Sequence, residues 1–200
     1  MTNDFNWIAP FYDKLQRIVF GDSLSRSATF YFDKITSDHK VLILGGGTGK
    51  IIEKIDRGAE ITFLDKSSVM MEKASLQKHP GLDLVAADFL KWKASRQFDF
   101  VVCPFFLDVF NRHHLSLALG KIHALLKRDG KLLVSDFQET GKTGHSILLR
   151  IMFLFFRVTV SLESKKLLSI LMEVENQGFL IEETKEFESG FVFTSVFRKN

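Results

Sequence analysis

The stretch Val41-Leu42-Ile43-Leu44-Gly45-Gly46-Gly47-Thr48-Gly49 decides the fold of this 200-residue chain. Its first four residues form a short, wholly apolar run, which is typical of a strand buried on both faces of a sheet. The glycines that follow let the backbone bend sharply and let a ligand approach where a Cβ atom would clash. Residues 51–55 continue with helical spacing. The stretch therefore predicts the strand–turn–helix opening of an α/β fold.

Strand-like and helix-like segments alternate along the rest of the chain. The strands are expected at residues 41–44, 60–65, 82–86, 98–103, 131–136, 179–187 and 191–198. The helices are expected at residues 67–77, 111–127 and 163–177. Apolar strands separated by helices indicate a parallel sheet, whereas the short Ser189-Gly190 turn fits only an antiparallel hairpin. We expect a Rossmann-like, seven-stranded, mostly parallel sheet with a C-terminal antiparallel hairpin and helices on both faces.

Three nucleotide-binding motifs compete for the glycine loop. A P-loop needs a hydroxyl residue after its Gly-Lys pair, and Ile51 stands there. A dinucleotide fingerprint that begins at Gly45 needs glycine or alanine at position 50, which is Lys50. The pattern G-x-G-x-G does fit, at Gly45, Gly47 and Gly49. The loop is therefore interpreted as a nucleoside site that needs no phosphate cradle.

Acidic residues end the next two strands. Asp65 stands twenty positions after Gly45, where a carboxylate can bind both hydroxyls of a ribose. Asp88 ends the third strand, where it can accept a hydrogen bond from an adenine amino group. Alone, Asp65 would more often be a helix cap than a ribose ligand, and the signal at Asp88 is weaker than that at Asp65. Together with the glycine loop they predict a site for adenosine without a pyrophosphate.

At this point the sequence resembles the class I S-adenosylmethionine-dependent methyltransferases, above all the small-molecule branch that includes the ubiquinone/menaquinone C-methyltransferases. The resemblance covers roughly residues 5–200. Its elements stand in the family's order and spacing: Val41 to Gly49, Asp65-Lys66-Ser67 continuing to Met70 and Ala74, Ala87-Asp88-Phe89, and Leu125 to Val134. Phe11-Tyr12-Asp13 is similar to the family's N-terminal Tyr-Asp pair.

The resemblance implies S-adenosyl-L-methionine as the cofactor. Asp65 would hold the ribose hydroxyls, Asp88 would meet the adenine amino group, and Tyr12 would close over the cofactor. The implied cofactor-binding residues are Tyr12, Gly45, Gly46, Gly47, Asp65, Lys66, Met70, Asp88, Phe89 and Cys103.

The methyl acceptor is expected on the far side of the cofactor, after the fourth strand. The chain holds 21 Phe against two Trp and two Tyr, and we assign most of them to core filling. Five of them are predicted to line an apolar acceptor pocket: Phe105, Phe106, Phe110, Phe153 and Phe156. No residue is identified as catalytic, and the candidates are Asp108, His113 and Asp136. The predicted reaction is O- or C-methylation of a small, apolar or aromatic acceptor.

Two departures from the family's pattern bear on function. Ile43 stands where the family has Asp or Glu, so an alternative is a catalytically inactive, cofactor-binding partner subunit. The fourth strand ends in Cys103-Pro104-Phe105-Phe106 rather than in the Asp/Asn-Pro-Pro-aromatic motif of nucleobase and glutamine N-methyltransferases. This difference argues against DNA and protein amides as acceptors. A third alternative is a nicotinamide oxidoreductase.

Length and composition fix the remaining expectations. We expect one methyltransferase domain over residues 1–200: an N-terminal helical cover (1–39), a cofactor-binding half (40–137), a lid (138–162) and a helix plus hairpin (163–200). The 27 basic and 24 acidic residues are too balanced for nucleic-acid binding. One Cys and scattered His residues predict neither a disulfide nor a metal site.

The location and assembly of the chain are predicted from what its sequence lacks. Neither a signal peptide nor an uninterrupted apolar segment of ~20 residues is present, which favours a cytoplasmic protein, monomeric or homodimeric. The apolar stretch 147–157 is open to four interpretations: a pocket lining, a peripheral membrane contact, a dimer interface or plain core.

Overall fold

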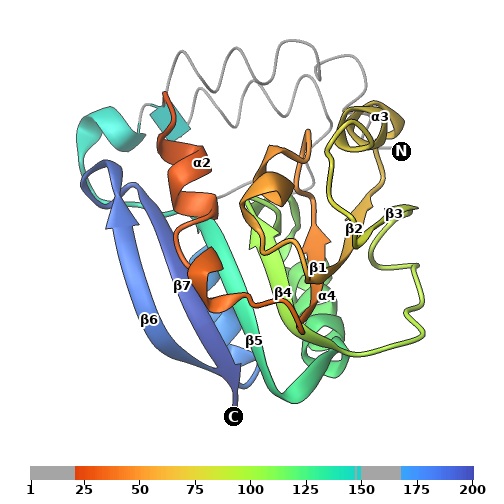
Figure 1. Cartoon of the computed structure of the whole chain (residues 1–200). Coiled ribbons are helices and arrows are strands. Elements are labelled where there is room, and N and C mark those ends of the chain that lie inside the picture. Colours follow the sequence, from red (N-terminus) through yellow and green to blue (C-terminus); the bar gives the residue numbers. More distant parts are fainter. Residues whose placement is uncertain (1–20, 147, 150–167) are drawn as a thin grey trace.

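Seven strands form one sheet in the order β3-β2-β1-β4-β5-β7-β6 (Figure 1). The computed structural model describes residues 21–146, 148–149 and 168–200. The strands are β1 (Lys40–Leu44), β2 (Glu60–Asp65), β3 (Leu82–Ala86), β4 (Phe98–Pro104), β5 (Leu126–Phe137), β6 (Phe179–Phe187) and β7 (Val192–Lys199). The first five are parallel, and β7 runs antiparallel to both β5 and β6. The predicted fold class is therefore confirmed.

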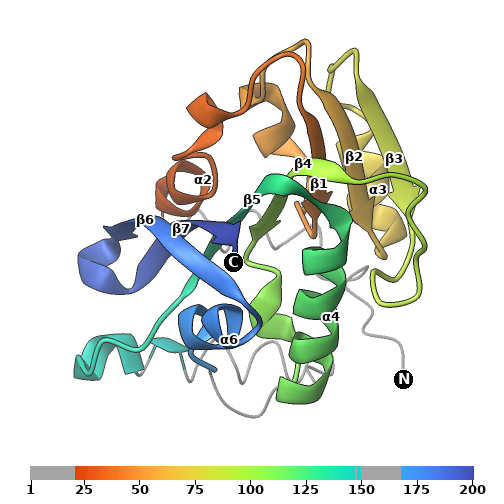
Figure 2. The ribbon, with the colours of Figure 1, turned by 90° about the horizontal axis from the view of Figure 1, so that it is seen from below.

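Helices cover both faces of the sheet. The α-helices are α2 (Ser23–Ala28), α3 (Ser68–Ala74), α4 (Arg112–Leu125) and α6 (Ile170–Asn176). The 3₁₀-helices are η1 (Phe32–Lys34), η2 (Lys50–Lys54), η3 (Leu107–Val109) and η4 (Glu188–Gly190). Figure 2 shows α4 and α6 together on one face and α2 on the other.

Each face has its own apolar core. Residues of α4 and α6, such as Leu119 and Val174, are fully buried against Val101 and Phe197 on one face. Residues of α2, η1, η2 and α3 pack on the opposite face around Phe63. Five phenylalanines are almost completely buried in these two cores: Phe63, Phe98, Phe179, Phe193 and Phe197. Phe191 is buried in a third, smaller cluster with Phe137 and Val192. Core filling is therefore the role of these six among the 21 Phe residues.

Local sequence explains where the helices begin. The Ser67 hydroxyl accepts a hydrogen bond from the Met70 amide at 3.3 Å, and the Asn111 side chain accepts one from the His114 amide at 2.9 Å. Both are N-cap bonds, which satisfy amides that have no partner inside the helix. Gly178 follows α6 with φ of 83°, a left-handed conformation that glycine adopts without strain.

Three predicted elements differ in form from the structure. Residues 50–54 form a 3₁₀-helix, because its isoleucines all pack inward over a single short turn. The helix predicted over 67–77 ends at Ala74. Strand β5 begins at Leu126 rather than at position 131, because Leu126 pairs with Phe98 before the register shifts near Gly130.

Candidate active site

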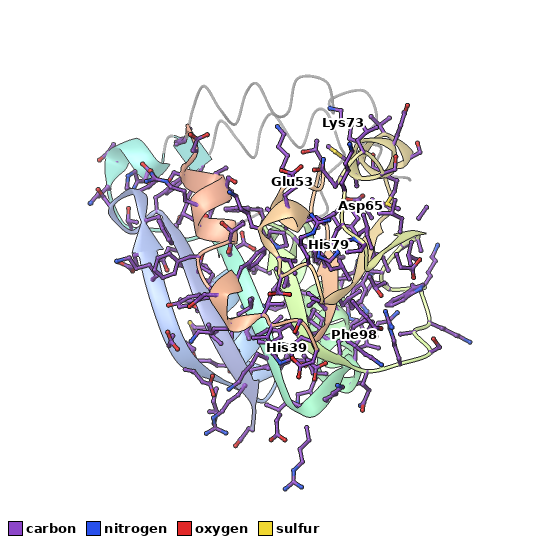
Figure 3. The ribbon with its side chains drawn as sticks, in the orientation of Figure 1. His39, Glu53, Asp65, Lys73, His79 and Phe98 are labelled. Atoms are coloured by element: carbon purple, nitrogen blue, oxygen red, sulfur yellow. The ribbon has the colours of Figure 1, made fainter. Side chains whose placement is uncertain are left out.

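The sheet reverses its winding between β1 and β4. From β1 the chain proceeds outward to β2 and β3, then returns to β4 on the other side of β1. Open α/β sheets bind ligands in the crevice at the carboxyl ends of their strands, at this kind of switch point. In Figure 3 Asp65 lies toward this end of the sheet, whereas His39 and Phe98 mark the opposite end.

The glycine loop leaves β1 at the switch point. The Gly45 amide donates to the Leu64 carbonyl at 3.1 Å, so the loop begins as an extension of the β1–β2 pairing. A Cβ atom on Gly45 would lie 2.5 Å from the Phe106 ring, and one on Gly46 would lie 2.4 Å from the Phe63 ring. Gly47 has φ of 57°, and no atom of the described residues lies within 4 Å of its Cβ position. The loop is therefore closely packed beneath and open at Gly47.

Asp65 ends β2 beside this loop. Its carboxylate accepts a hydrogen bond from the Ser67 amide at 2.9 Å, and its carbonyl accepts one from the Ala87 amide at 3.1 Å. Burial raises the pKa of Asp65 to about 6 in spite of the Ser67 bond and the nearby Lys66 charge, which both lower it. A ligand that donates hydrogen bonds to such a carboxylate stabilises its charged form.

The two predicted neighbours of Asp65 differ in exposure. Lys66 is exposed and Met70, in the first turn of α3, is buried. Both follow Asp65 directly in the chain, at the same edge of the sheet.

The turn after β3 carries Asp88 and Phe89. Asp88 is exposed, and its carboxylate accepts a hydrogen bond from the Leu90 amide at 2.9 Å, while Phe89 is buried. Lys121 of α4 reaches this turn and donates to the carbonyls of Phe89, Leu90 and Trp92. Its ammonium also lies 4.9 Å from the centre of the Phe89 ring.

Lys121 is a residue that sequence reasoning missed. It stands about thirty positions from the turn that it holds, on a helix whose pattern gives no reason to single out one lysine. No local signal could have found it.

The three predicted pocket phenylalanines after β4 do not form one group. Phe106 lies 5.2 Å from Phe110 and 6.0 Å from Phe89, measured between ring centres. Phe105 has φ of 53° and turns away to Phe137, 5.0 Å distant. The structure therefore joins a predicted cofactor residue, Phe89, with two predicted acceptor residues and separates Phe105 from them.

Two of the three catalytic candidates lie together. Asp136 at the carboxyl end of β5 is completely buried, and Asp108 lies in η3, directly after β4. Each electrostatically affects the other, and Asp136 also affects the buried thiol of Cys103. His113 is exposed at the start of α4. Sequence reasoning named the two acids separately and did not place them side by side.

The remaining residues singled out from the sequence either lie outside the described part of the chain or are buried in an apolar core. Tyr12, Phe153 and Phe156 lie outside the described residues. Ile43, which stands in place of the family's acid, is completely buried in the core that contains Phe63.

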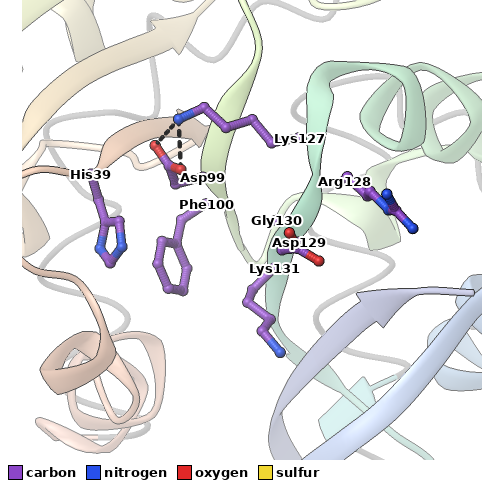
Figure 4. Close-up of a pocket in the computed structure, with 8 residues that line it drawn as sticks. All are labelled: His39, Asp99, Phe100, Lys127, Arg128, Asp129, Gly130 and Lys131. Atoms are coloured by element: carbon purple, nitrogen blue, oxygen red, sulfur yellow. Dashed lines mark hydrogen bonds and ion pairs between the residues drawn. The ribbon is translucent and has the colours of Figure 1, made fainter.

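A separate cavity of about 430 Å³ lies at the opposite end of the sheet (Figure 4). It is lined by His39, Asp99, Phe100, Lys127, Arg128, Asp129, Gly130 and Lys131. Its charged groups are largely paired with others: Lys127 contacts Asp99 at 2.7 Å, and Lys131 contacts Glu182 at 2.5 Å. This cavity is distinct from the edge that carries the glycine loop.

Comparison with known proteins agrees with this geometry. A methyltransferase-domain family matches residues 41–130. Over these residues the chain is similar to the class I S-adenosylmethionine-dependent methyltransferases. The ubiquinone/menaquinone biosynthesis C-methyltransferase UbiE of Rhizobium meliloti (strain 1021) is 31% identical over 113 residues, which are 51% of this chain and 43% of that protein. The chain therefore matches less than half the length of that relative.

Solved methyltransferases share the whole fold. The putative methyltransferase of Haloferax volcanii, solved in complex with the Trm112 methyltransferase activator, superimposes with a TM-score of 0.77 at 14% identity, covering 100% of this chain and 99% of that one. The 1,6-didemethyltoxoflavin-N1-methyltransferase of Burkholderia thailandensis, with its acceptor and S-adenosylhomocysteine bound, gives 0.67 at 14% identity, covering 96% and 85%. At these identities the likeness concerns the fold alone.

Two features are absent from the described part of the chain. None of its described helices is long and apolar enough to cross a membrane. Over the same residues, no group of three or more His, Cys, Asp or Glu side chains is arranged to hold a metal ion.

Proposed function

We propose that this chain binds S-adenosyl-L-methionine and transfers its methyl group to a small, apolar or aromatic acceptor, by O- or C-methylation. The observation that carries the proposal is the convergence of the glycine loop, Asp65 and the Asp88 turn at the carboxyl ends of β1, β2 and β3. The names of two relatives support a small acceptor, since one acts in quinone biosynthesis and the other on 1,6-didemethyltoxoflavin.

The residues present fit an adenosine-bearing cofactor. Gly47 offers open space above the loop, and the partly buried Asp65 carboxylate can accept two ribose hydroxyls. Met70 and Phe89 are almost completely buried next to this site, and Asp88 offers a carboxylate for the amino group of an adenine ring. In this arrangement Gly45, Gly46 and Gly47 pass under the methionine and ribose parts. Lys66 flanks the adenine, Cys103 lies near the methyl group, and Tyr12 closes over the site.

The work of the chain is alignment and exclusion of water. When bound, the cofactor supplies a methyl group already activated by the positive charge on its sulfur. Phe106 and Phe110 are placed to hold an apolar acceptor next to the glycine loop, because the Phe106 ring packs directly against Gly45. Holding two reactants in line converts a bimolecular reaction into an effectively unimolecular one. In this proposal residues 138–162 form the lid that keeps water out.

Replacement of Asp65 tests the cofactor site. We expect Asp65→Ala to weaken the affinity for S-adenosylhomocysteine by about 10–100-fold, since it removes hydrogen bonds to a charged group worth ~1.5–3 kcal/mol. Titration calorimetry measures this affinity. Asp83→Ala, which replaces an exposed acid of β3, is the matched control and should bind like the wild type. Unchanged affinity in Asp65→Ala contradicts the proposed site.

The alternative function is that of a cofactor-binding partner subunit without activity. The observation that favours it is Ile43, whose buried side chain leaves the end of β1 without the family's acid. The Haloferax methyltransferase was solved with an activator protein, so protein partners occur among proteins of this fold. Methyl transfer to quinols and phenols by the wild-type chain supports the enzyme, whereas cofactor binding without any transfer supports the partner subunit.

A further inference from the structure

The side chain of Asp136 is an unusual group for a protein interior. It is completely buried at the carboxyl end of β5. One carboxyl oxygen accepts a hydrogen bond from the Phe137 amide at 2.8 Å, and the other, Oδ2, has no hydrogen-bond partner among the described residues. Nearly all buried polar atoms have a partner, so an unpaired carboxyl oxygen calls for an explanation such as a ligand or a proton.

A second acid acts on Asp136 among the described residues. The titratable groups that act on it or are affected by it are Asp108 of η3 and Cys103 of β4. Backbone amides of Leu107, Asp108 and Phe137 favour its charged form. Burial and the neighbouring Asp108 outweigh them and raise the pKa of Asp136 well above its usual range.

Asp108 is the accessible member of the pair. It is partly exposed, whereas Asp136 is sealed. Burial raises the pKa of Asp108 to about 6. Two carboxyl groups that repel each other electrostatically do not both ionise easily. We therefore expect the pair to retain one proton at neutral pH, on Asp136, with the negative charge on Asp108.

The pair lies on the acceptor side of the switch point. Strand β5 and η3 are in contact, and η3 follows Phe105 and Phe106 directly. The Phe106 ring in turn packs against the Gly45 position and stacks edge-on against Phe110. An apolar wall and a buried acid pair therefore border the same edge of the sheet as the glycine loop.

We propose that Asp108 is the base that accepts the proton of the acceptor, that Asp136 positions it, and that the acceptor is an aromatic ring with a hydroxyl group. This inference rests on the proposed function. The hydroxyl oxygen forms a bond to the methyl carbon, the carbon–sulfur bond breaks with its electron pair going to sulfur, and the hydroxyl proton passes to the Asp108 carboxylate. The aromatic ring is inferred from Phe106 and Phe110, which are partly exposed and contact each other edge-on next to Gly45.

Infrared difference spectroscopy of the protein itself tests the proton that the pair retains. We expect wild type at pH 7 to show a protonated carboxyl that is absent in Asp136→Asn. Asp83→Asn, an exposed acid outside the pair, should leave that signal unchanged. A wild-type spectrum at pH 7 without a buried protonated carboxyl overturns the proposal, and this result needs no acceptor and no cofactor.

Methyl transfer to two phenols tests the base. Phenol must lose its proton during transfer, whereas 4-nitrophenol is largely ionised before it binds at pH 8. We expect Asp108→Asn to lose about 100-fold or more in kcat/KM with phenol, and less than tenfold with 4-nitrophenol. Equal losses with both probes contradict a base at Asp108, and no turnover of either phenol by wild type contradicts the aromatic hydroxyl.

The pH profile separates the positioning role of Asp136 from a structural one. We expect kcat/KM of wild type to rise through about pH 6 as Asp108 loses its proton. Asp136→Asn should move this midpoint, whereas a purely structural change lowers the rate at every pH alike.

Calorimetry with S-adenosylhomocysteine distinguishes a failure of this inference from a failure of the proposed function. Wild type that fails to bind it refutes the proposed function, and binding by Asp108→Asn at wild-type affinity shows that a lost rate comes from the base.

Discussion

The carboxyl ends of β1 and β2 are shaped by residues that are neighbours in the chain, whereas those of β4 and β5 are shaped by residues far apart. Asp65 is held by the amide of Ser67, and Ser67 in turn caps α3. Asp108 and Asp136 meet only because β4 pairs with β5, with Cys103 opposite Val134. The cofactor side, at the ends of β1 and β2, can therefore be predicted from a short motif. The acceptor side, at the ends of β4 and β5, depends on how the sheet assembles.

Gly45 is the point at which the two sides touch, and its replacement should have the largest effect. Gly45→Ala places a Cβ atom 2.5 Å from the Phe106 ring at φ of 68°. We expect it to lower the free energy of unfolding by about 2–4 kcal/mol, from left-handed strain plus overpacking. Chemical denaturation measures the change.

Gly47→Ala is the matched control for the contact with the acceptor side. Gly47 has φ of 57° but open space around its Cβ position, so the cost should be strain alone, about 1–2 kcal/mol. If the free energy of unfolding falls equally in Gly45→Ala and Gly47→Ala, the contact with Phe106 does not stabilise the loop.

Replacement of Lys121 tests whether the cofactor side depends only on residues that are neighbours in the chain. Lys121→Met leaves the carbonyls of Phe89, Leu90 and Trp92 without their donor, which should lower the free energy of unfolding by about 1–3 kcal/mol. Affinity for S-adenosylhomocysteine should fall with it, because the Asp88 turn loses its support from α4. Lys121→Arg keeps a cationic donor and should recover most of both. If Lys121→Met binds and unfolds like the wild type, the turn is self-supporting.

The contrast between the two sides also explains what sequence alone could predict. The apolar run 41–44, the Ser67 and Asn111 caps and the Ser189-Gly190 turn are local signals, and with the alternation of strands and helices they were enough for the sheet and its hairpin. The placement of Asp65 after β2 follows from the same spacing.

What sequence could not predict depends on side-chain direction and long-range pairing. Phe105 and Phe106 are adjacent, yet the positive φ of Phe105 turns the two rings to different faces of the sheet. The electrostatic effect of Asp108 on Asp136 and the hydrogen bonds from Lys121 to the Phe89 turn join segments about thirty residues apart. The roles assigned to Tyr12, Phe153 and Phe156 stay predictions, since these residues lie outside the described part of the chain.

The smallest effect expected is a gain in stability when the cofactor side loses its charge. Asp65 has an ordinary pKa of 3.8 in the unfolded chain and a pKa of about 6 in the folded protein. Between these values the folded state binds more protons than the unfolded state, so stability falls as pH rises. Two pKa units correspond to ~3 kcal/mol, which partial exposure of Asp65 reduces to about 1–2 kcal/mol.

Asp65→Asn should therefore raise the free energy of unfolding at pH 7.5 by about 1–2 kcal/mol and leave it nearly unchanged at pH 4, where the folded carboxyl is already neutral. The amide oxygen can still accept the Ser67 hydrogen bond, so the comparison isolates the charge. Asp108 and Asp136 are the same in both proteins, and their own pH dependence cancels in the difference. Denaturation curves at the two pH values measure it. If Asp65→Asn is less stable than wild type at pH 7.5, the Asp65 charge stabilises the fold. Burial of that charge then carries no cost for a bound ligand to offset.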